Sequence, residues 1–164
     1  MQSVSREDSY ERFQRLMPRT QDLTLIILKG HLLLEEQLQQ FLDDLSRKPD
    51  ALKDARLTFF QRWRLTQAIT GYSRTNNIGR FIEGASKLRN RLAHILEVAD
   101  LDDAVDRLLM AFHQSDTCPT FSKGQRATEL RRAFSLTIAM LNGFTTGYLI
   151  GLGEPWLSKV GNNS

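Results

Sequence analysis

Arg89, Asn90 and His94 lie within one six-residue string, RNRLAH, near the middle of the chain. Imidazole is the side chain most readily used for proton transfer near neutral pH. A guanidinium stays charged and binds two phosphate oxygens at once. Asn90 precedes His94 by four residues, so on a helix its amide can hold the imidazole or donate to the same phosphate. These residue types permit a catalytic group in which His94 transfers a proton, Arg89 stabilises phosphate charge and Asn90 supports both. The simpler interpretation is a basic helix end at the surface, where Asn90 and His94 satisfy local hydrogen bonds.

His31 is the second candidate for chemistry, with Glu35 one helical turn further along the chain. It is in phase with Ile27 and Leu34, so one interpretation is a hydrogen-bonded histidine on an apolar helix face. The other interpretation is a polar group that lines a binding cleft together with Glu35. The third histidine, His113, precedes a loop and is expected at the surface.

The remaining sequence offers little for metal or cofactor chemistry. No histidine has a second histidine or a cysteine at metal-ligand spacing, and the patterns GxGxxG, GK[ST] and GxSxG do not occur. We therefore expect no metal and no cofactor. Cys118 is the single cysteine, so it forms no intrachain disulfide, and we expect it to be inert. Its lack of a partner fits a reducing compartment, and the polar N-terminal segment lacks the apolar stretch of a secretory signal, so we expect a cytoplasmic protein.

Basic residues are concentrated in the segment 55–94. It holds eight basic residues and one acid, Glu83, which gives the segment a net charge of +7 on a chain whose net charge is +3. Such a local excess suits a phosphate-rich partner, and its simpler interpretation is a solvated helix face. If this face meets RNA, the phosphate-binding residues are expected to be Lys87, Arg91, Arg62 and Arg64.

The elements that must position these residues are all predicted to be helices. Leucine-rich patterns recur at helical spacing, and no stretch alternates with a period of two. Asp22 is expected to cap the second helix, Pro49 to end that region, Gly71 to close the third helix, and Asp100 to cap the fifth. The expected helices cover residues 6–17, 23–46, 57–69, 78–96, 101–112 and 126–152. The chain is thus predicted to be one all-α, antiparallel helical bundle of about five main helices and a short N-terminal one, spanning 1–164 with loose tails at 1–5 and 159–164.

The last predicted helix also carries a long uncharged run, residues 133–153, which raises the alternative of a membrane span. Its serine, three threonines, asparagine and four glycines make it less hydrophobic than a typical span, so we expect a buried helix and no membrane. Gly143, Gly147 and Gly151 fall on one stripe, where a second helix can approach closely. The stripe faces either the core or a second subunit, and the sequence does not decide between them.

Three parts of the chain resemble the HEPN domain family. Arg89, four intervening residues and His94, with Asn90 directly after the arginine, look like the R-x4-6-H signature of HEPN domains. The string GHLLLEEQLQQFL, residues 30–42, resembles the long central helix of small HEPN proteins. The string LTFFQRWRLTQAI, residues 57–69, resembles the segment that links the two. The resemblance covers residues 23–97, less than half of the chain.

This resemblance implies a metal-independent endoribonuclease, for example the toxin of a toxin–antitoxin or defence system, that assembles its site at the interface of a homodimer. On an ideal helix Arg89 and His94 project about 140° apart, so one protomer does not obviously bring both to a single phosphate. Two copies of the motif facing each other across a cleft would solve this, as would a helix that loosens near His94. The alternative function is a non-catalytic HEPN module that binds nucleic acid, a nucleotide or a protein partner, such as an antitoxin or a regulatory protein.

Overall fold

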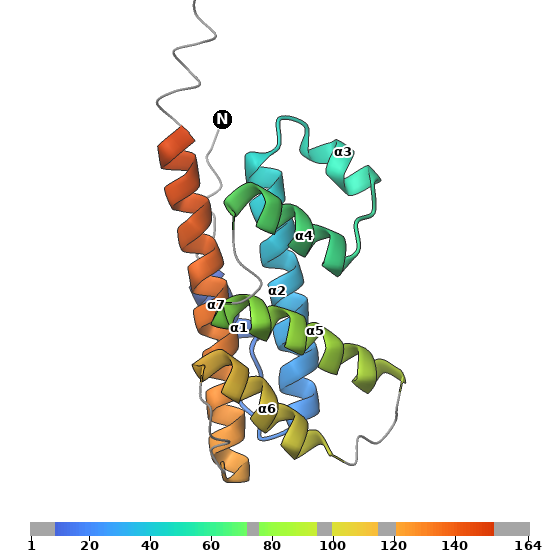
Figure 1. Ribbon diagram of the computed structural model, residues 1–164, viewed down its shortest axis with the longest axis vertical. Helices are drawn as coiled ribbons and strands as arrows, with labels where there is room; N and C mark the ends of the chain where they lie inside the picture. The colour runs from blue at the N-terminus through green and yellow to red at the C-terminus, as the bar shows by residue number, and fades with distance from the viewer. Residues whose placement is uncertain (1–8, 72–75, 95–99, 115–120, 153–164) are drawn as a thin grey trace, which may run out of the picture.

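The computed structural model describes residues 9–71, 76–94, 100–114 and 121–152, and every regular element in these ranges is an α-helix (Figure 1). The expected tails, residues 1–5 and 159–164, and Cys118 lie outside the described residues. The helices are α1 (Ser9–Leu16), α2 (Leu23–Leu45), α3 (Pro49–Asp54), α4 (Phe59–Thr70), α5 (Asn77–His94), α6 (Leu101–His113) and α7 (Lys123–Leu152). The predicted all-α helical bundle is confirmed.

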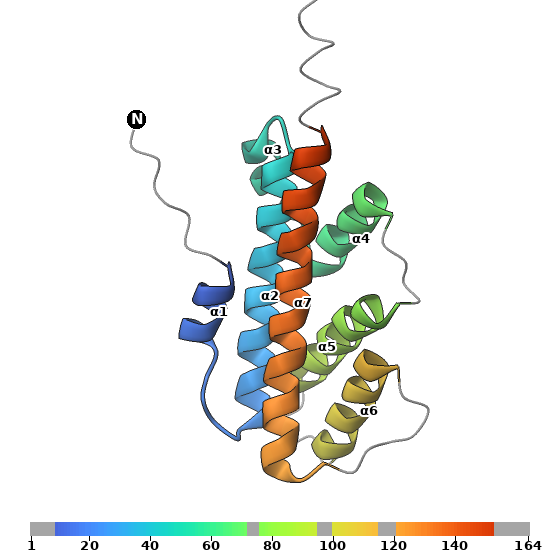
Figure 2. The ribbon, with the colours of Figure 1, turned by 90° about the vertical axis from the view of Figure 1, so that its left-hand side faces the viewer.

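The two longest helices, α2 and α7, lie side by side and form the axis of the molecule (Figure 2). Both run in the same direction. Arg131, near the start of α7, donates a hydrogen bond to the backbone carbonyl of Thr20, which precedes α2. Further along, the ring of Phe134 lies directly against the backbone of Gly30. The expectation of an antiparallel bundle is therefore wrong for this pair, because the chain returns to its starting end through α4, α5 and α6 before α7 begins.

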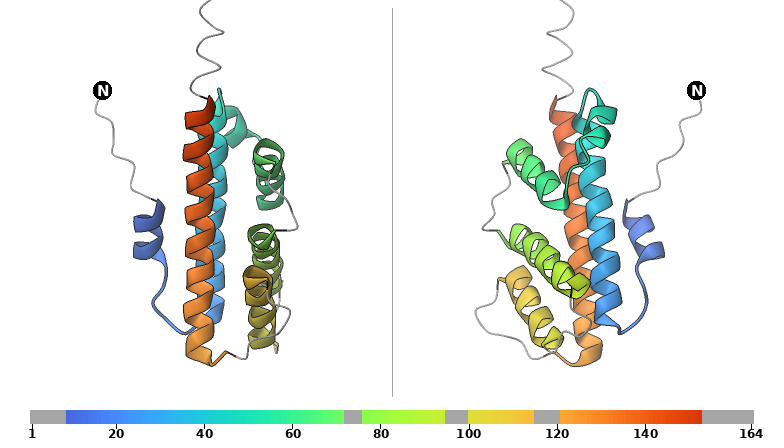
Figure 3. Two further views of the ribbon diagram at one scale, coloured as in Figure 1. Left: turned by 60° about the vertical axis from the view of Figure 1, so that its left-hand side comes forward. Right: turned by 90° about the vertical axis from the view of Figure 1, so that its right-hand side faces the viewer.

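The helices α4, α5 and α6 pack on one face of the α2–α7 pair, and α1 packs on the opposite face (Figure 3). Within this layer α5 is antiparallel to both α4 and α6, as the predicted antiparallel bundle requires (Figure 1). Edge-to-face aromatic contacts connect the layers: the ring centroids of Phe134 and Phe81 lie 5.0 Å apart, and those of Phe81 and Phe112 lie 5.3 Å apart. All three rings are buried, so α5 and α6 are fixed to α7 through the core.

Local sequence signals explain where the helices begin and end. The carboxylate of Asp22 accepts a hydrogen bond from the Leu25 N–H at 3.1 Å, which confirms the predicted cap. Thr58 and Gln61 form a capping box at the start of α4, and Gly71 ends that helix in the left-handed region with φ of 68°. Pro49, which we expected only to end a region, starts α3 instead, because a proline at the first helical position loses no hydrogen bond.

The described part of the glycine stripe on α7, Gly143 and Gly147, faces away from the core. Gly143 and Gly147 are exposed, and no heavy atom lies within 4 Å of the position that a Cβ would take at either residue. The close approach of two helices occurs at Gly30, where a Cβ would lie 2.6 Å from the Phe134 ring. Within the part of the chain that the structure describes, no helix has the length and apolar character needed to cross a membrane.

These two glycine environments give opposite expectations for the change to alanine. Gly30→Ala forces Phe134 off the α2 backbone and should lower the free energy of unfolding by about 1–3 kcal/mol, as overpacking does. Gly143→Ala adds a better helix former in open space and should raise it by about 0.5–1 kcal/mol. Urea unfolding followed by circular dichroism measures both changes. Equal effects of the two substitutions would show that α2 and α7 do not depend on the contact at Gly30.

Candidate functional site

The RNRLAH string lies on the last two turns of α5. Asn76 caps this helix by accepting a hydrogen bond from the Gly79 N–H at 2.7 Å. The apolar side chains that follow are buried at helical spacing: Ile78, Phe81, Ile82, Ala85 and Leu88. The helix is therefore held by one face, and its C-terminal turns present polar side chains on the others. His94 is its last residue and is exposed.

Arg89 lies close enough to His31 of α2 for its charge to act on the imidazole, and His31 is buried with only 3% of its surface exposed. The imidazole packs against the ring of Phe59, with centroids 4.3 Å apart. Neither ring nitrogen of His31 has a hydrogen-bond partner among the described residues. The interpretation of His31 as a hydrogen-bonded core histidine is therefore wrong for the described part of this chain, because the apolar ring of Phe59 covers the imidazole.

The surroundings of His31 keep it neutral. Burial lowers the pKa of His31 from 6.5 to about 4, the negative charge of Glu35 opposes this shift, and the positive charge of Arg89 adds to it. Burial dominates because an apolar environment penalises the charged form of the ring. Glu35 and Arg89 thus both lie close enough to act on the imidazole. The structure places Arg89 near His31 and Glu35, whereas nothing in the sequence links Arg89 to that pair.

The two arginines of α4 already have partners within the chain. Arg62 donates to Glu35 at 2.5 Å and to the amide oxygen of Gln39 at 2.7 Å. Arg64 donates to the amide oxygen of Gln67 at 3.0 Å and lies over the ring of Phe60, 4.8 Å from its centroid. Their phosphate-binding role stays a prediction, and RNA would have to compete with these partners.

Asn90 and His94 are exposed at the end of α5. The amide oxygen of Asn90 accepts a hydrogen bond from the Arg89 guanidinium at 3.2 Å. His94 forms no hydrogen bond or ion pair with the described residues. Because α5 stays helical through His94, the imidazole projects about 140° away from Arg89. One chain therefore does not direct both side chains at a single phosphate.

Lys87 and Arg91 lie on the outer side of α5, next to α6, where Arg80 and Arg107 join them. Asp100, expected to cap α6, makes no capping hydrogen bond. Its carboxylate instead binds Arg91 at 2.8 Å and Arg107 at 3.4 Å, and the hydrogen bond from Arg91 lowers the pKa of Asp100. The arginines on both helices thus compete successfully with the backbone for this carboxylate.

Sequence reasoning missed several residues at these places. The spacing of Arg80 and Lys87, seven residues apart, puts them on one helix stripe and could have been noticed. By contrast, Phe59 over His31 and Arg107 beside Arg91 depend on how helices pack. The same holds for the buried amide of Gln67, whose nitrogen has no partner among the described residues. No local signal in the sequence indicates such contacts.

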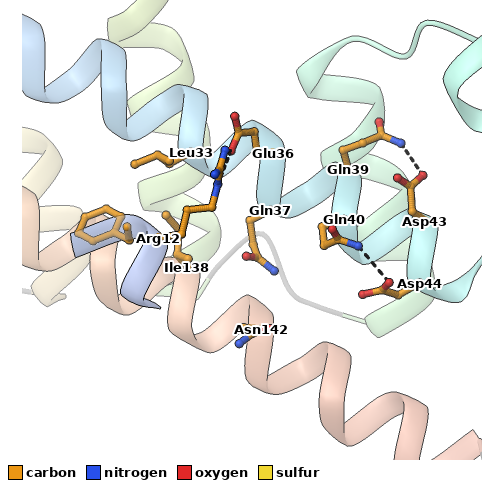
Figure 4. A pocket seen from close by; sticks show the side chains of 11 residues that line it. Arg12, Leu33, Glu36, Gln37, Gln39, Gln40, Asp43, Asp44, Ile138 and Asn142 are labelled. Atoms are coloured by element: carbon orange, nitrogen blue, oxygen red, sulfur yellow. Dashed lines mark hydrogen bonds and ion pairs between the residues drawn. The ribbon is translucent and has the colours of Figure 1, made fainter. Parts of the chain in front are cut away.

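A separate pocket of about 450 Å³ lies between α1, α2 and α7 (Figure 4). Arg12 and Glu36 form an ion pair at 2.9 Å at its edge, and Asp43 and Asp44 accept hydrogen bonds from the amides of Gln39 and Gln40. None of the residues predicted for the site lines this pocket. No group of three or more potential metal ligands occurs in the described ranges.

Comparison of the chain with protein-family models, with curated proteins and with solved structures finds no match. The fold and site together define an all-α helical bundle with a basic helix end beside a buried, neutral histidine. Membership of the HEPN family stays a prediction that rests on the residues quoted above.

The neutral state of His31 predicts a specific pH dependence of stability. The unfolded chain binds a proton at this residue below pH 6.5, whereas the folded chain does so only near pH 4. The free energy of unfolding should therefore fall as the pH is lowered through this window, by about 3 kcal/mol in total. His31→Leu should remove this part of the pH dependence, as measured by urea unfolding at pH 7, 5.5 and 4.

His94→Ala is the matched control. It removes an exposed histidine, so the free energy of unfolding should fall on acidification as much as it does in the wild type. If His31→Leu lost stability with acid as steeply as the wild type does, His31 would not be held neutral by its surroundings.

Proposed function

We propose that this protein is a HEPN-type, metal-independent endoribonuclease that cuts RNA as a homodimer. The observation that carries the proposal is the exposed His94, which has no partner among the described residues and stands at the end of a basic helix. Arg89, five residues earlier, supplies a guanidinium beside a neutral polar group, His31. A role as the toxin of a toxin–antitoxin or defence system belongs to the same proposal.

The proposed reaction needs only groups that this chain carries. His94 in its neutral form takes the proton from the 2′-hydroxyl, whose oxygen then attacks the adjacent phosphorus. The bond from phosphorus to the 5′-oxygen breaks, and this oxygen receives the proton from the His94 imidazole that took it up. Arg89 stabilises the extra negative charge on the phosphate through two parallel N–H groups. The products are a 2′,3′-cyclic phosphate and a free 5′-hydroxyl.

Exposed apolar side chains beside the site support the homodimer. Leu32 directly follows His31 and is 50% exposed, and Phe60 directly follows Phe59 and is 53% exposed. Large apolar groups gain by leaving water, so these two exposed side chains suit an interface with a second copy. A second copy on this surface would bring the two RNRLAH helix ends near the two-fold axis.

A second function has its own observation. Within one chain, Arg89 and His94 point to different sides of α5, and Arg89 donates to Asn90. This arrangement favours a non-catalytic module that binds nucleic acid, a nucleotide or a regulatory protein if no second copy completes the site.

The ribonuclease proposal predicts the behaviour of three substitutions. His94→Ala should lower cleavage by about 10²–10⁴-fold, since general acid–base catalysis is lost, while folding and RNA binding persist. Arg89→Ala should also abolish cleavage, and Arg89→Lys should restore little, because an ammonium lacks the planar pair of donors. Gel assays on several RNAs, with EDTA present and with analysis of the cleaved ends, measure rate, metal independence and the cyclic phosphate together.

His113→Ala serves as the control. His113 is an exposed histidine of α6 that pairs with Glu129 at 3.4 Å, away from the motif, and its loss should leave cleavage unchanged. If the His94→Ala protein cut RNA at the wild-type rate, this mechanism would be wrong. A wild type that binds RNA but cuts none of the substrates would favour the binding module.

A further inference from the structure

A groove runs between α5 and α6 on the outer side of the bundle, with a volume of about 340 Å³. Four basic side chains line it: Arg80, Lys87 and Arg91 from α5, and Arg107 from α6. Its floor includes Gly84 and Leu108. A Cβ at Gly84 would lie 2.7 Å from a methyl carbon of Leu108, so the missing side chain lets the helices approach closely. The long basic side chains of α5 and α6 therefore line the two sides of the groove.

The charge of this groove is poorly neutralised. Arg80 and Lys87 are exposed and form no ion pair or hydrogen bond with the described residues. Arg91 and Arg107 share a single carboxylate, that of Asp100. Two other acids of α6, Asp102 and Asp106, are directed elsewhere, since both bind Arg126 of α7. Glu83, the only acid on α5, is half-buried.

The presence of cations without ion pairs among the described residues distinguishes the groove from the arginines of α4. Arg62 and Arg64 are bound to Glu35, Gln39 and Gln67, so a phosphate would have to displace those groups. In the groove, at least two cations are available without breaking any such contact. Phosphate contacts dominate the affinity of proteins for nucleic acid, so the free cations set where the backbone lies.

The groove also leads to the candidate catalytic group. Arg80, Lys87, Arg91 and His94 follow one another at intervals of seven, four and three residues, which places them along one stripe of α5. The stripe extends over about 21 Å by the rise of an α-helix. That length accommodates several nucleotides of a single strand.

We propose that the groove between α5 and α6 binds the backbone of single-stranded RNA and guides it to His94. This inference rests on the proposed ribonuclease function for its last step only. The four basic side chains and the absence of aromatic side chains among the groove's lining residues favour contacts to phosphate over base stacking. Binding should therefore depend on salt and depend little on sequence.

The test compares two double variants that each remove two positive charges from exposed side chains. Arg80→Ala with Lys87→Ala empties the groove of its free cations. Lys48→Ala with Lys53→Ala removes the same charge beside and within α3, away from the groove. Both are made in the His94→Ala protein, so that no cleavage disturbs binding. Fluorescence anisotropy with a labelled single-stranded RNA, over a series of salt concentrations, measures affinity.

The groove variant should bind at least about ten-fold more weakly at low salt, and its plot of log K against log salt concentration should be shallower by about 1.4. The α3 variant should stay within about two-fold of its parent. Equal affinities of the two variants, or a parent protein that binds no RNA at low salt, would overturn the inference. Cleavage by the wild type is measured separately, so a groove that binds RNA without cleavage would refute the ribonuclease function alone.

Discussion

The contact between Gly30 and Phe134 determines how the rest of the bundle is arranged. Because Gly30 has no side chain, the Phe134 ring lies directly on the backbone of α2, and the two longest helices pack closely along the axis. The other side of the same ring meets the edge of Phe81 on α5, which meets Phe112 on α6. The position of α5, and hence of the RNRLAH string at its end, follows from this chain of rings.

The two main candidate catalytic residues, Arg89 and His94, lie on different sides of α5. One face is buried, and on its margin Arg89 lies near His31, whose neutrality follows from burial against Phe59. The outer side carries His94 in line with the basic residues of the groove. A rigid helix cannot turn both side chains toward one phosphate, because five residues correspond to about 140°. A ribonuclease built on this helix therefore needs a second copy of it, and a protein that stays monomeric is better suited to binding than to catalysis.

The sequence predicted the helices well where their signals are local. The cap at Asp22, the leucine pattern of α2 and the stop at Gly71 act within one or two turns, so the chain near them determines the outcome. Features that depend on packing were missed or wrong. The parallel course of α2 and α7 depends on how three intervening helices cross them, and Asp100 binds arginines instead of capping its helix. Likewise, the sequence could mark Arg62 as basic but could not reveal that Glu35 and Gln39 bind it.

The most direct test of the shared site is a mixed dimer of His94→Ala and Arg89→Ala chains, carrying different tags and purified through both. Each homodimer lacks one essential group at both sites, whereas the mixed dimer keeps one site with an intact Arg89 from one protomer and an intact His94 from the other. We predict that the purified mixed dimer recovers about half of the wild-type cleavage rate, since one of its two equivalent sites is complete. A mixed dimer as inactive as either homodimer would contradict a site built from Arg89 of one protomer and His94 of its partner.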